Sequence, residues 1–140
     1  ESRPLVDDLK RLPNAQVIDR EVSDREMVRE LENADWLVLP YTAATQSGVI
    51  VDAFLHGRPV IAFDVGAIPE QVTDGYNGRL VPEGDVDGFI KAVREVSTST
   101  AEELGTYSRN AYQFAYERYS AEAAAESFLK NVTLQATEKA

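Results

Sequence analysis

Apolar residues along this chain follow helical spacing in some segments and form short continuous runs in others. Helical spacing predicts helices over residues 4–12, 23–33, 86–96 and 100–115, and from 121 to about 134. Capping boxes at Ser23 and Thr100, each with a glutamate three residues later, support two of these helix starts. Short apolar runs predict strands over residues 16–19, 36–39, 59–63 and 79–81. The run 36–39 is apolar throughout, as expected for a strand covered on both faces.

The segment over residues 47–63 has two interpretations. Residues 49–51 are β-branched, so the segment could form a β-hairpin that turns near Gly57. A helix followed by a strand is favoured for three reasons. Ser47 can serve as its N-cap, Gly57 suits the C′ position, and Pro59 ends a helix but would weaken a central strand.

Strands that alternate with helices predict parallel pairing through right-handed crossovers. We therefore expect an α/β fold, a Rossmann-like doubly wound sheet of four parallel strands with helices on both faces. The chain has 140 residues, enough for one core, so residues 1–140 are expected to form a single domain.

Composition narrows the function. The formal net charge of −10 offers no basic face for nucleic acid or an anionic membrane. No segment approaches the roughly 20 apolar residues of a membrane span. The chain has no cysteine and one histidine, which argues against disulfides and a zinc site and suits a cytoplasmic protein.

The start of the helix near Ser47 is the first candidate for chemistry. Free backbone N–H groups at a helix start can bind an anion. Asp52 is the only charged residue between Pro40 and Leu55, and it lies four residues after Gly48 on the same helix face. A ligand hydroxyl could be the partner of its carboxylate. Alternatively, Asp52 caps or pairs with a neighbouring backbone group, or forms an acid–base pair with His56.

Open parallel sheets bind ligands at the carboxyl ends of their strands. In the expected sheet this edge gathers the loops 20–22, 41–48 and 64–70. Arg20 is the cation of the first loop, or an unengaged surface charge. Gly66 would let a ligand approach the backbone, whereas Asp64 either faces a ligand or forms an Asx turn. Glu70 either contacts an acceptor or caps a short helical turn.

Four motifs between residues 40 and 82 carry a family resemblance. They read GRPVI at 57–61, DVGA at 64–67, IPE at 68–70 and DGYNGRLVP at 74–82. In this order and register they resemble the nucleotide-sugar-binding domain of retaining glycosyltransferases of the GT-B fold. The fold expected from the resemblance is thus the C-terminal half of a GT-B enzyme.

The resemblance implies retaining transfer of a sugar from a nucleotide diphosphate sugar to an acceptor hydroxyl, with no metal or other cofactor required. It places the nucleotide base on the loop of Arg20, Glu21 and Val22, through the backbone. The leaving diphosphate would be stabilised by backbone amides of Ser47, Gly48 and Val49. The implied donor-binding residues are Thr45, Gln46, Ser47, Gly48, Val49 and Asp52, with Asp64, Gly66 and Glu70 as further candidates and no residue assigned to catalysis.

The sequence departs from the family pattern at one of two acidic positions. The family carries two glutamates separated by seven residues, the first contacting the transferred sugar and the second the nucleotide ribose. Here the second position is Asp52, a conservative change, but the first is Ala44. The resemblance therefore predicts a retained ribose contact and altered recognition of the donor sugar.

Two other classes remain open, a nucleotide-binding regulatory module and a GT-B nucleotide-sugar epimerase domain. In each case we expect the chain to be part of a longer protein. An N-terminal domain outside this sequence would bind the acceptor saccharide or lipid, so the chain alone should have no transferase activity. The full protein is expected in the cytoplasm or at the inner face of the membrane.

Overall fold

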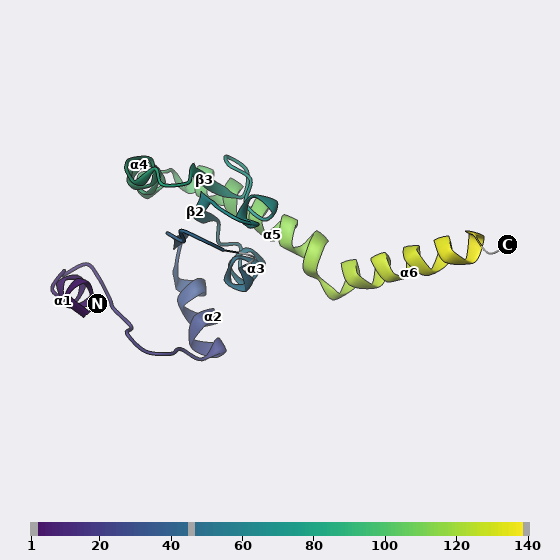
Figure 1. The fold of residues 1–140 in the computed structure, drawn as a ribbon, viewed down its shortest axis with the longest axis horizontal. Helices are drawn as coiled ribbons and strands as arrows, with labels where there is room; N and C mark the ends of the chain where they lie inside the picture. Colours follow the sequence, from purple (N-terminus) through teal and green to yellow (C-terminus); the bar gives the residue numbers. More distant parts are fainter. Residues whose placement is uncertain (1–2, 45–46, 139–140) are drawn as a thin grey trace.

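Three parallel strands form the centre of the structure, a computed structural model that describes residues 3–44 and 47–138 (Figure 1). They are β1 (Leu37–Leu39), β2 (Val60–Asp64) and β3 (Gly78–Pro82), in the order β1-β2-β3. Leu37 lies opposite Val60, and Val60 lies opposite Gly78. The carboxyl ends of all three strands therefore meet at one edge.

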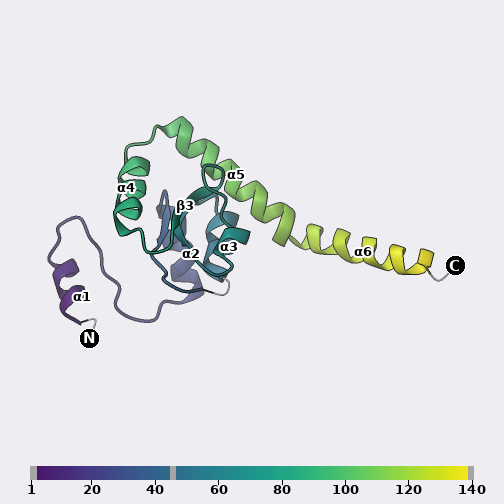
Figure 2. The same cartoon turned by 45° about the horizontal axis from the view of Figure 1, so that its top comes forward.

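The described part of the chain also contains six α-helices and one 3-10 turn. They are α1 (Arg3–Lys10), α2 (Asp24–Asn33), α3 (Gly48–Leu55), η1 (Ile68–Glu70), α4 (Val86–Ser97), α5 (Ala101–Tyr119) and α6 (Ala121–Glu138). Figure 2 shows α3 and α4 on opposite sides of the sheet, with α5 beyond α3. Both views place α1 and α6 away from the sheet, at opposite ends of the molecule. The α/β fold class, a parallel sheet with helices on both faces, is confirmed.

The hydrophobic core lies on both faces of β2. Phe63 packs against Phe89 of α4 with ring centroids 4.5 Å apart. On the other side of the sheet, Phe54 of α3 meets Phe114 of α5 edge to face at 5.8 Å. Phe54 and Ile50 have no exposed surface, so α3 is held between the sheet and α5.

The helix interpretation of residues 47–55 is confirmed, and the hairpin is excluded. Helix α3 ends at Leu55, and Gly57 takes the positive φ of 66° expected at C′. Ser47 is the N-cap residue, but its side chain makes no capping hydrogen bond. The capping boxes at Ser23 and Thr100 are both formed.

The expectation of a fourth strand over residues 16–19 is wrong. This segment has no strand structure, and Figure 1 shows the connection between α1 and α2 running outside the sheet. Its apolar centre is only Val17 and Ile18, and Ile18 remains 39% exposed. An extended segment without a neighbouring strand gains no ladder hydrogen bonds, so two apolar residues do not hold it in place.

The strand predicted over residues 36–39 was expected to be covered on both faces, and this expectation is also wrong. Strand β1 pairs only with β2 among the described residues, which makes it an edge strand here. Val38 is 40% exposed, so the strand is not covered on both faces. The neighbouring Trp36 packs against the core as predicted, with its ring 5.0 Å from that of Tyr107.

Arg58 joins the end of α2 to the turn before β2. Its Nε donates to the carbonyl of Leu31 at 2.9 Å, and its Nη2 donates to the carbonyl of Glu32 at 2.8 Å. Both carbonyls belong to the last turn of α2, where i→i+4 partners are missing. That of Leu31 also accepts from the N–H of Ala34 at 3.2 Å. One side chain therefore fixes how α2 approaches the sheet.

We expect Arg58→Met to lower the free energy of unfolding by about 1–2 kcal/mol, because two hydrogen bonds from a charged donor are lost. Chemical denaturation would measure the change. The matched control is Arg109→Met, which removes a guanidinium bonded to a single hydroxyl of Thr106 on the same helix. It should cost less than about 0.5 kcal/mol, and equal losses for the two variants would contradict this role of Arg58.

Candidate functional site

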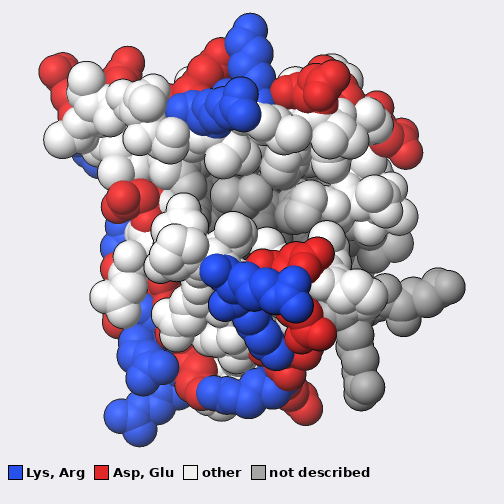
Figure 3. Space-filling view, turned by 90° about the vertical axis from the view of Figure 1, so that its left-hand side faces the viewer, with Lys and Arg blue, Asp and Glu red and all other residues white. Residues whose placement is uncertain are grey.

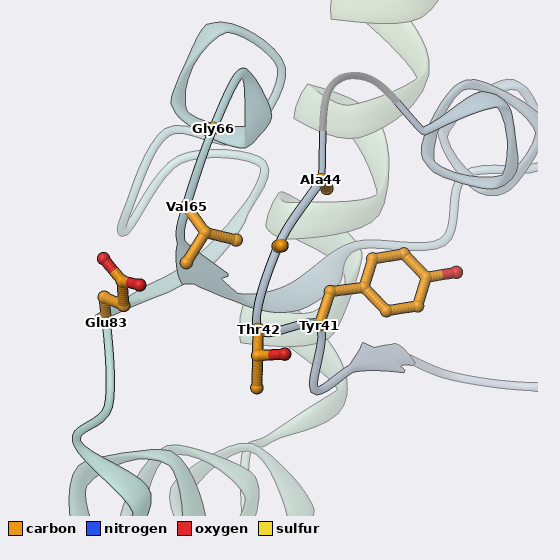
Figure 4. A pocket seen from close by; sticks show the side chains of 7 residues that line it. Tyr41, Thr42, Ala44, Val65, Gly66 and Glu83 are labelled. Atoms are coloured by element: carbon orange, nitrogen blue, oxygen red, sulfur yellow. The ribbon is translucent and has the colours of Figure 1, made fainter.

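A cleft of about 630 Å³ opens at the carboxyl ends of the three strands. Each strand contributes the loop that follows it, as Figure 4 shows. The lining residues are Tyr41, Thr42, Ala43 and Ala44 after β1, Val65 and Gly66 after β2, and Glu83 after β3. In Figure 4 the Tyr41 ring points away from Glu83, while Val65 lies between Glu83 and the loop after β1.

Gly66 and Ala44 bring two of these loops into direct contact. Gly66 has a φ of 54°, and a Cβ built on it would overlap the carbonyl oxygen of Ala44. The sequence predicted that Gly66 admits a ligand to the backbone. On the side where a Cβ would stand, the space is filled by the chain's own backbone, so the glycine is needed for the loops to meet. Gly66 also lines the cleft, and the approach of a ligand to its backbone stays a prediction.

The amino end of α3 is exposed next to this loop pair. Gly48 is exposed, and no atom lies within 4 Å of the position that its Cβ would occupy. The N–H groups of Gly48 and Val49 belong to the first turn and have no helical acceptor. The N–H of Ser47 is different, because it donates to Oε1 of Gln71 at 3.3 Å. Within the described residues, the amides of Gly48 and Val49 have no acceptor, so two of the three predicted phosphate-binding amides are available to a ligand.

Asp52 lies on the exposed face of α3, one turn after Gly48. The apolar surroundings expected for its carboxylate are not found. Within the described residues, this carboxylate has neither a hydrogen bond nor an ion pair, so it caps nothing. The ring of His56 bonds to the main-chain oxygen of Asp52 at 2.7 Å, not to its carboxylate, which removes the acid–base pair.

Three further carboxylates border the strand ends. Asp64 ends β2, Glu70 ends η1, and Glu83 follows β3, all exposed. None of them has a polar partner in the part of the chain that the structure describes. The Asx turn considered for Asp64 and the capping role considered for Glu70 are therefore wrong, and η1 has no side-chain cap. Glu83 was missed, although it follows a strand in the same way as Asp64.

Arg20 is neither a free surface charge nor a free cation for a ligand. Its guanidinium donates to the carboxylate of Glu26 at 2.6 Å and to the carbonyl of Glu21 at 3.0 Å. Glu26 in turn accepts from the N–H of Ser23, completing the capping box of α2. The hydrogen bond from Arg20, followed by those from Ser23, lowers the pKa of Glu26 to about 2.

Other expected ligands do not meet at the cleft. Arg20, Glu21 and Val22 lie before α2 and are not among its lining residues. Thr45 and Gln46 lie outside the described residues. Among the side chains that the structure describes, over residues 4–44 and 47–130, no three acidic or histidine groups gather closely enough to hold a metal ion.

Charge is mixed on the side of the molecule shown in Figure 3. Lys and Arg side chains lie next to Asp and Glu side chains, and no continuous basic area covers this face. Among the described helices, none is both long and apolar enough to cross a bilayer.

Comparison with known proteins identifies the family. Residues 3–99 match the family of glycosyl transferases group 1. That match covers more than half of the 140 residues. This chain belongs to that family.

Sequence relatives of this glycosyltransferase chain are bacterial enzymes. The D-inositol 3-phosphate glycosyltransferase of Streptomyces coelicolor is 34% identical over an alignment of 77 residues. The alignment covers 51% of the chain and 17% of the relative. The phosphatidyl-myo-inositol mannosyltransferase of Mycolicibacterium smegmatis is 32% identical over 74 residues, 52% of the chain and 19% of the relative. The aligned region therefore covers less than a fifth of either enzyme.

Solved structures share the fold of this glycosyltransferase chain. Sucrose-phosphate synthase from Thermosynechococcus elongatus superposes with a TM-score of 0.77 at 20% identity, over 99% of the chain and 34% of the synthase. HepE of Anabaena in complex with UDP-glucose gives 0.74 at 21% identity, over 94% of the chain and 36% of HepE. The chain is thus a domain of the GT-B glycosyltransferase fold and spans about a third of these proteins.

Gly66→Ala should test whether the loop contact shapes the cleft. We expect it to cost about 2–4 kcal/mol of unfolding free energy, because a side chain would meet both a positive φ and the Ala44 carbonyl. Gly75→Ala is the control, since Gly75 has a φ of 76° but open space around it. It should cost only about 1–2 kcal/mol, and equal costs by denaturation would show that the Ala44 contact is unimportant.

The low pKa of Glu26 predicts a pH dependence. A carboxyl group whose folded pKa lies below its unfolded value stabilises the fold above that unfolded value, and this contribution is lost as pH falls toward the folded pKa. We therefore expect the capping box to weaken between about pH 4.5 and pH 2. In an NMR pH titration, Arg20→Met should raise the Glu26 midpoint toward 4.5. Arg11→Met, which removes the partner of Asp8, should leave that midpoint near 2.

Proposed function

We propose that this chain is the donor domain of a retaining glycosyltransferase and binds a nucleotide diphosphate sugar at the carboxyl ends of β1, β2 and β3. In the full protein, the sugar would pass to an acceptor hydroxyl held by a second domain, without a metal ion. The observation that carries this proposal is the first turn of α3, exposed at Gly48, beside the cleft of a domain with the GT-B fold. Two of its N–H groups have no acceptor among the described residues.

The diphosphate is assigned to the first turn of α3. The N–H groups of Gly48 and Val49 point out of the helix start, where the helix dipole favours negative charge. The chain carries a net charge of −10, so these local donors must outweigh a repulsive overall field. Backbone dipoles fixed in place before the ligand arrives stabilise a leaving diphosphate effectively. Thr45 and Gln46 precede this turn, and we assign them to the same end of the donor.

The ribose is assigned to Asp52. Its carboxylate is exposed and unbonded within the described residues, on the same helix face as Gly48. Helical side chains lean toward the amino end of their helix, so this carboxylate is directed toward the phosphate position. A carboxylate that accepts hydrogen bonds from two vicinal hydroxyls would fix the nucleoside. The base would then lie toward residues 20–22, against backbone groups.

The sugar is assigned to the cleft between Ala44 and Glu83. Thr42 and Glu83 offer a hydroxyl and a carboxylate from opposite loops, and sugar hydroxyls can bond to both. Asp64 ends β2 and Glu70 ends η1, and we assign both to the side of the acceptor. HepE, which shares this fold, has been solved with UDP-glucose and with UDP and glucose, and this supports the assignment.

A first experiment is amide-shift NMR on the chain with millimolar UDP, GDP, ADP and their sugars. We expect shifts at Gly48, Val49 and Asp52 and a preference for one base. A sugar that adds affinity over the bare diphosphate supports a donor domain, whereas no added affinity favours a regulatory nucleotide-binding module. Shifts confined to other faces would overturn the proposed site.

Asp52→Asn tests the ribose contact directly. We expect about tenfold weaker binding of the preferred nucleoside diphosphate, since hydrogen bonds to a charged acceptor are worth about 1.5–3 kcal/mol. The loss should disappear for the 2′,3′-dideoxy nucleotide, which lacks the hydroxyls. Asp7→Asn on α1 makes the same chemical change at an exposed site far from the cleft and should have no effect. An equal loss for both nucleotides would remove Asp52 from the ribose site.

A further inference from the structure

Gln71 forms a two-point bond to the residue that precedes α3. Its Oε1 accepts from the N–H of Ser47 at 3.3 Å, and its Nε2 donates to the carbonyl of Ser47 at 3.3 Å. Gln71 lies 24 residues further along the chain and is only 6% exposed. A buried amide side chain is costly unless its polar atoms are satisfied, and here one residue satisfies both ends.

The backbone of Gln71 is itself fixed by Asn77. Asn77 has no exposed surface. Its Nδ2 donates to the carbonyl of Gln71 at 3.0 Å, and its Oδ1 accepts from the N–H of Thr73 at 2.8 Å. The connection between η1 and β3 is therefore held from within, and Gln71 projects from a rigid segment.

Gln71 holds the start of α3, which has no side-chain cap. The Ser47 side chain makes no capping hydrogen bond, although the Ser47 carbonyl accepts from the N–H of Ile50 at 3.2 Å. Gln71 thus sets the direction of the peptide groups that begin the helix. It also occupies the Ser47 N–H, which leaves the N–H groups of Gly48 and Val49 exposed.

We propose that Gln71 is a positioning residue for the donor. Acting through Ser47, it orients the first turn of α3 so that the amides of Gly48 and Val49, and not that of Ser47, bind the diphosphate. The proposal rests on the proposed function, because it assigns this turn to phosphate. It also divides the turn into one structural amide and two binding amides.

The alternative is that Gln71 only fills a buried space. A residue with that role would affect folding but not discriminate between ligands with and without phosphates. The two roles are therefore separated by comparing a nucleoside diphosphate with its nucleoside, and by following the Ser47 amide itself.

The experiment compares Gln71→Met and Gln71→Glu with the parent chain. Methionine keeps the length and removes both polar atoms. Glutamate keeps an acceptor for the Ser47 N–H but places a negative charge against the Ser47 carbonyl and near the phosphates. Gln113→Met is the matched control, since Gln113 is an exposed glutamine on α5 bonded to Glu117. The readouts are hydrogen exchange at Ser47 and dissociation constants for UDP, GDP and ADP and their nucleosides.

For Gln71→Met we expect at least tenfold faster exchange at Ser47, about tenfold weaker diphosphate binding and unchanged nucleoside binding. For Gln71→Glu we expect Ser47 to keep most of its protection while diphosphate binding weakens more than in Gln71→Met. Gln113→Met should change neither quantity. If Gln71→Met does not fold, Gln71→Glu still tests the proposal through its effect on diphosphate alone.

Three results would overturn the proposal. Unchanged exchange at Ser47 in Gln71→Met would show that the bond does not hold the helix start. Equal losses for diphosphate and nucleoside would reduce Gln71 to a packing residue. Failure of the parent chain to bind any nucleotide would overturn the proposed function and the positioning role together, while faster exchange at Ser47 would still establish the bond between the two segments.

Discussion

Phe54 has no exposed surface, and its ring lies edge to face against Phe114 at 5.8 Å. This contact, with the burial of Ile50 and Ala53, holds α3 between β2 and α5. A helix of eight residues is too short to be stable alone, so its position comes from packing. The exposed first turn can serve as a binding site only because the rest of the helix is buried. Loss of this packing would therefore disorder the site before it unfolded the sheet.

The cleft is shaped by two contacts between the same pair of segments. Ala44 meets Gly66, and Ser47 is bonded by Gln71, so the loop after β1 is fixed to the β2–β3 connection at points three residues apart. Neither contact involves a charged group, so neither competes with an incoming phosphate. The side chains between these two points can therefore be substituted while residues 44 and 47 keep their contacts.

Much of the framework could be predicted from the sequence. Periodicity and caps gave α2 and α4 nearly to the residue and the start of α5, which ends four residues later than predicted, at Tyr119. Ser47, Gly57 and Pro59 distinguished a helix from a hairpin. The strand at 16–19 failed because pairing with another segment, not local composition, decides whether an extended run becomes a strand. The site was harder. The sequence singled out Gly66 as a site candidate. Its contact with Ala44 joins two separate loops, and no local sequence pattern shows such a contact.

The polar contacts of Gln71 and Arg20 escaped prediction for a related reason. A single glutamine after Ile68–Glu70 has no periodicity, and its partner is 24 residues away. The sequence left Arg20 as the cation of its loop or an unengaged surface charge, whereas the carboxylate of Glu26 binds both Arg20 and Ser23. Sequence patterns show where backbone N–H and carbonyl groups require hydrogen-bond partners, but they do not show which distant side chains supply those partners.

The lack of a side-chain cap at Ser47 affects which substitutions this protein can accept during evolution. In most helices the residue at the cap position must supply the hydrogen bond that starts the helix, which restricts its identity. Here the Ser47 side chain makes no capping hydrogen bond, and the backbone of Ser47 is held by a distant glutamine, so position 47 is not restricted by a capping role. Residue 71 fixes the geometry of the helix start, whereas the side chains of the loop after β1 can vary and change which donor is recognised. A domain built in this way can acquire a new donor preference by substitution in one loop without first losing the helix that binds the phosphates.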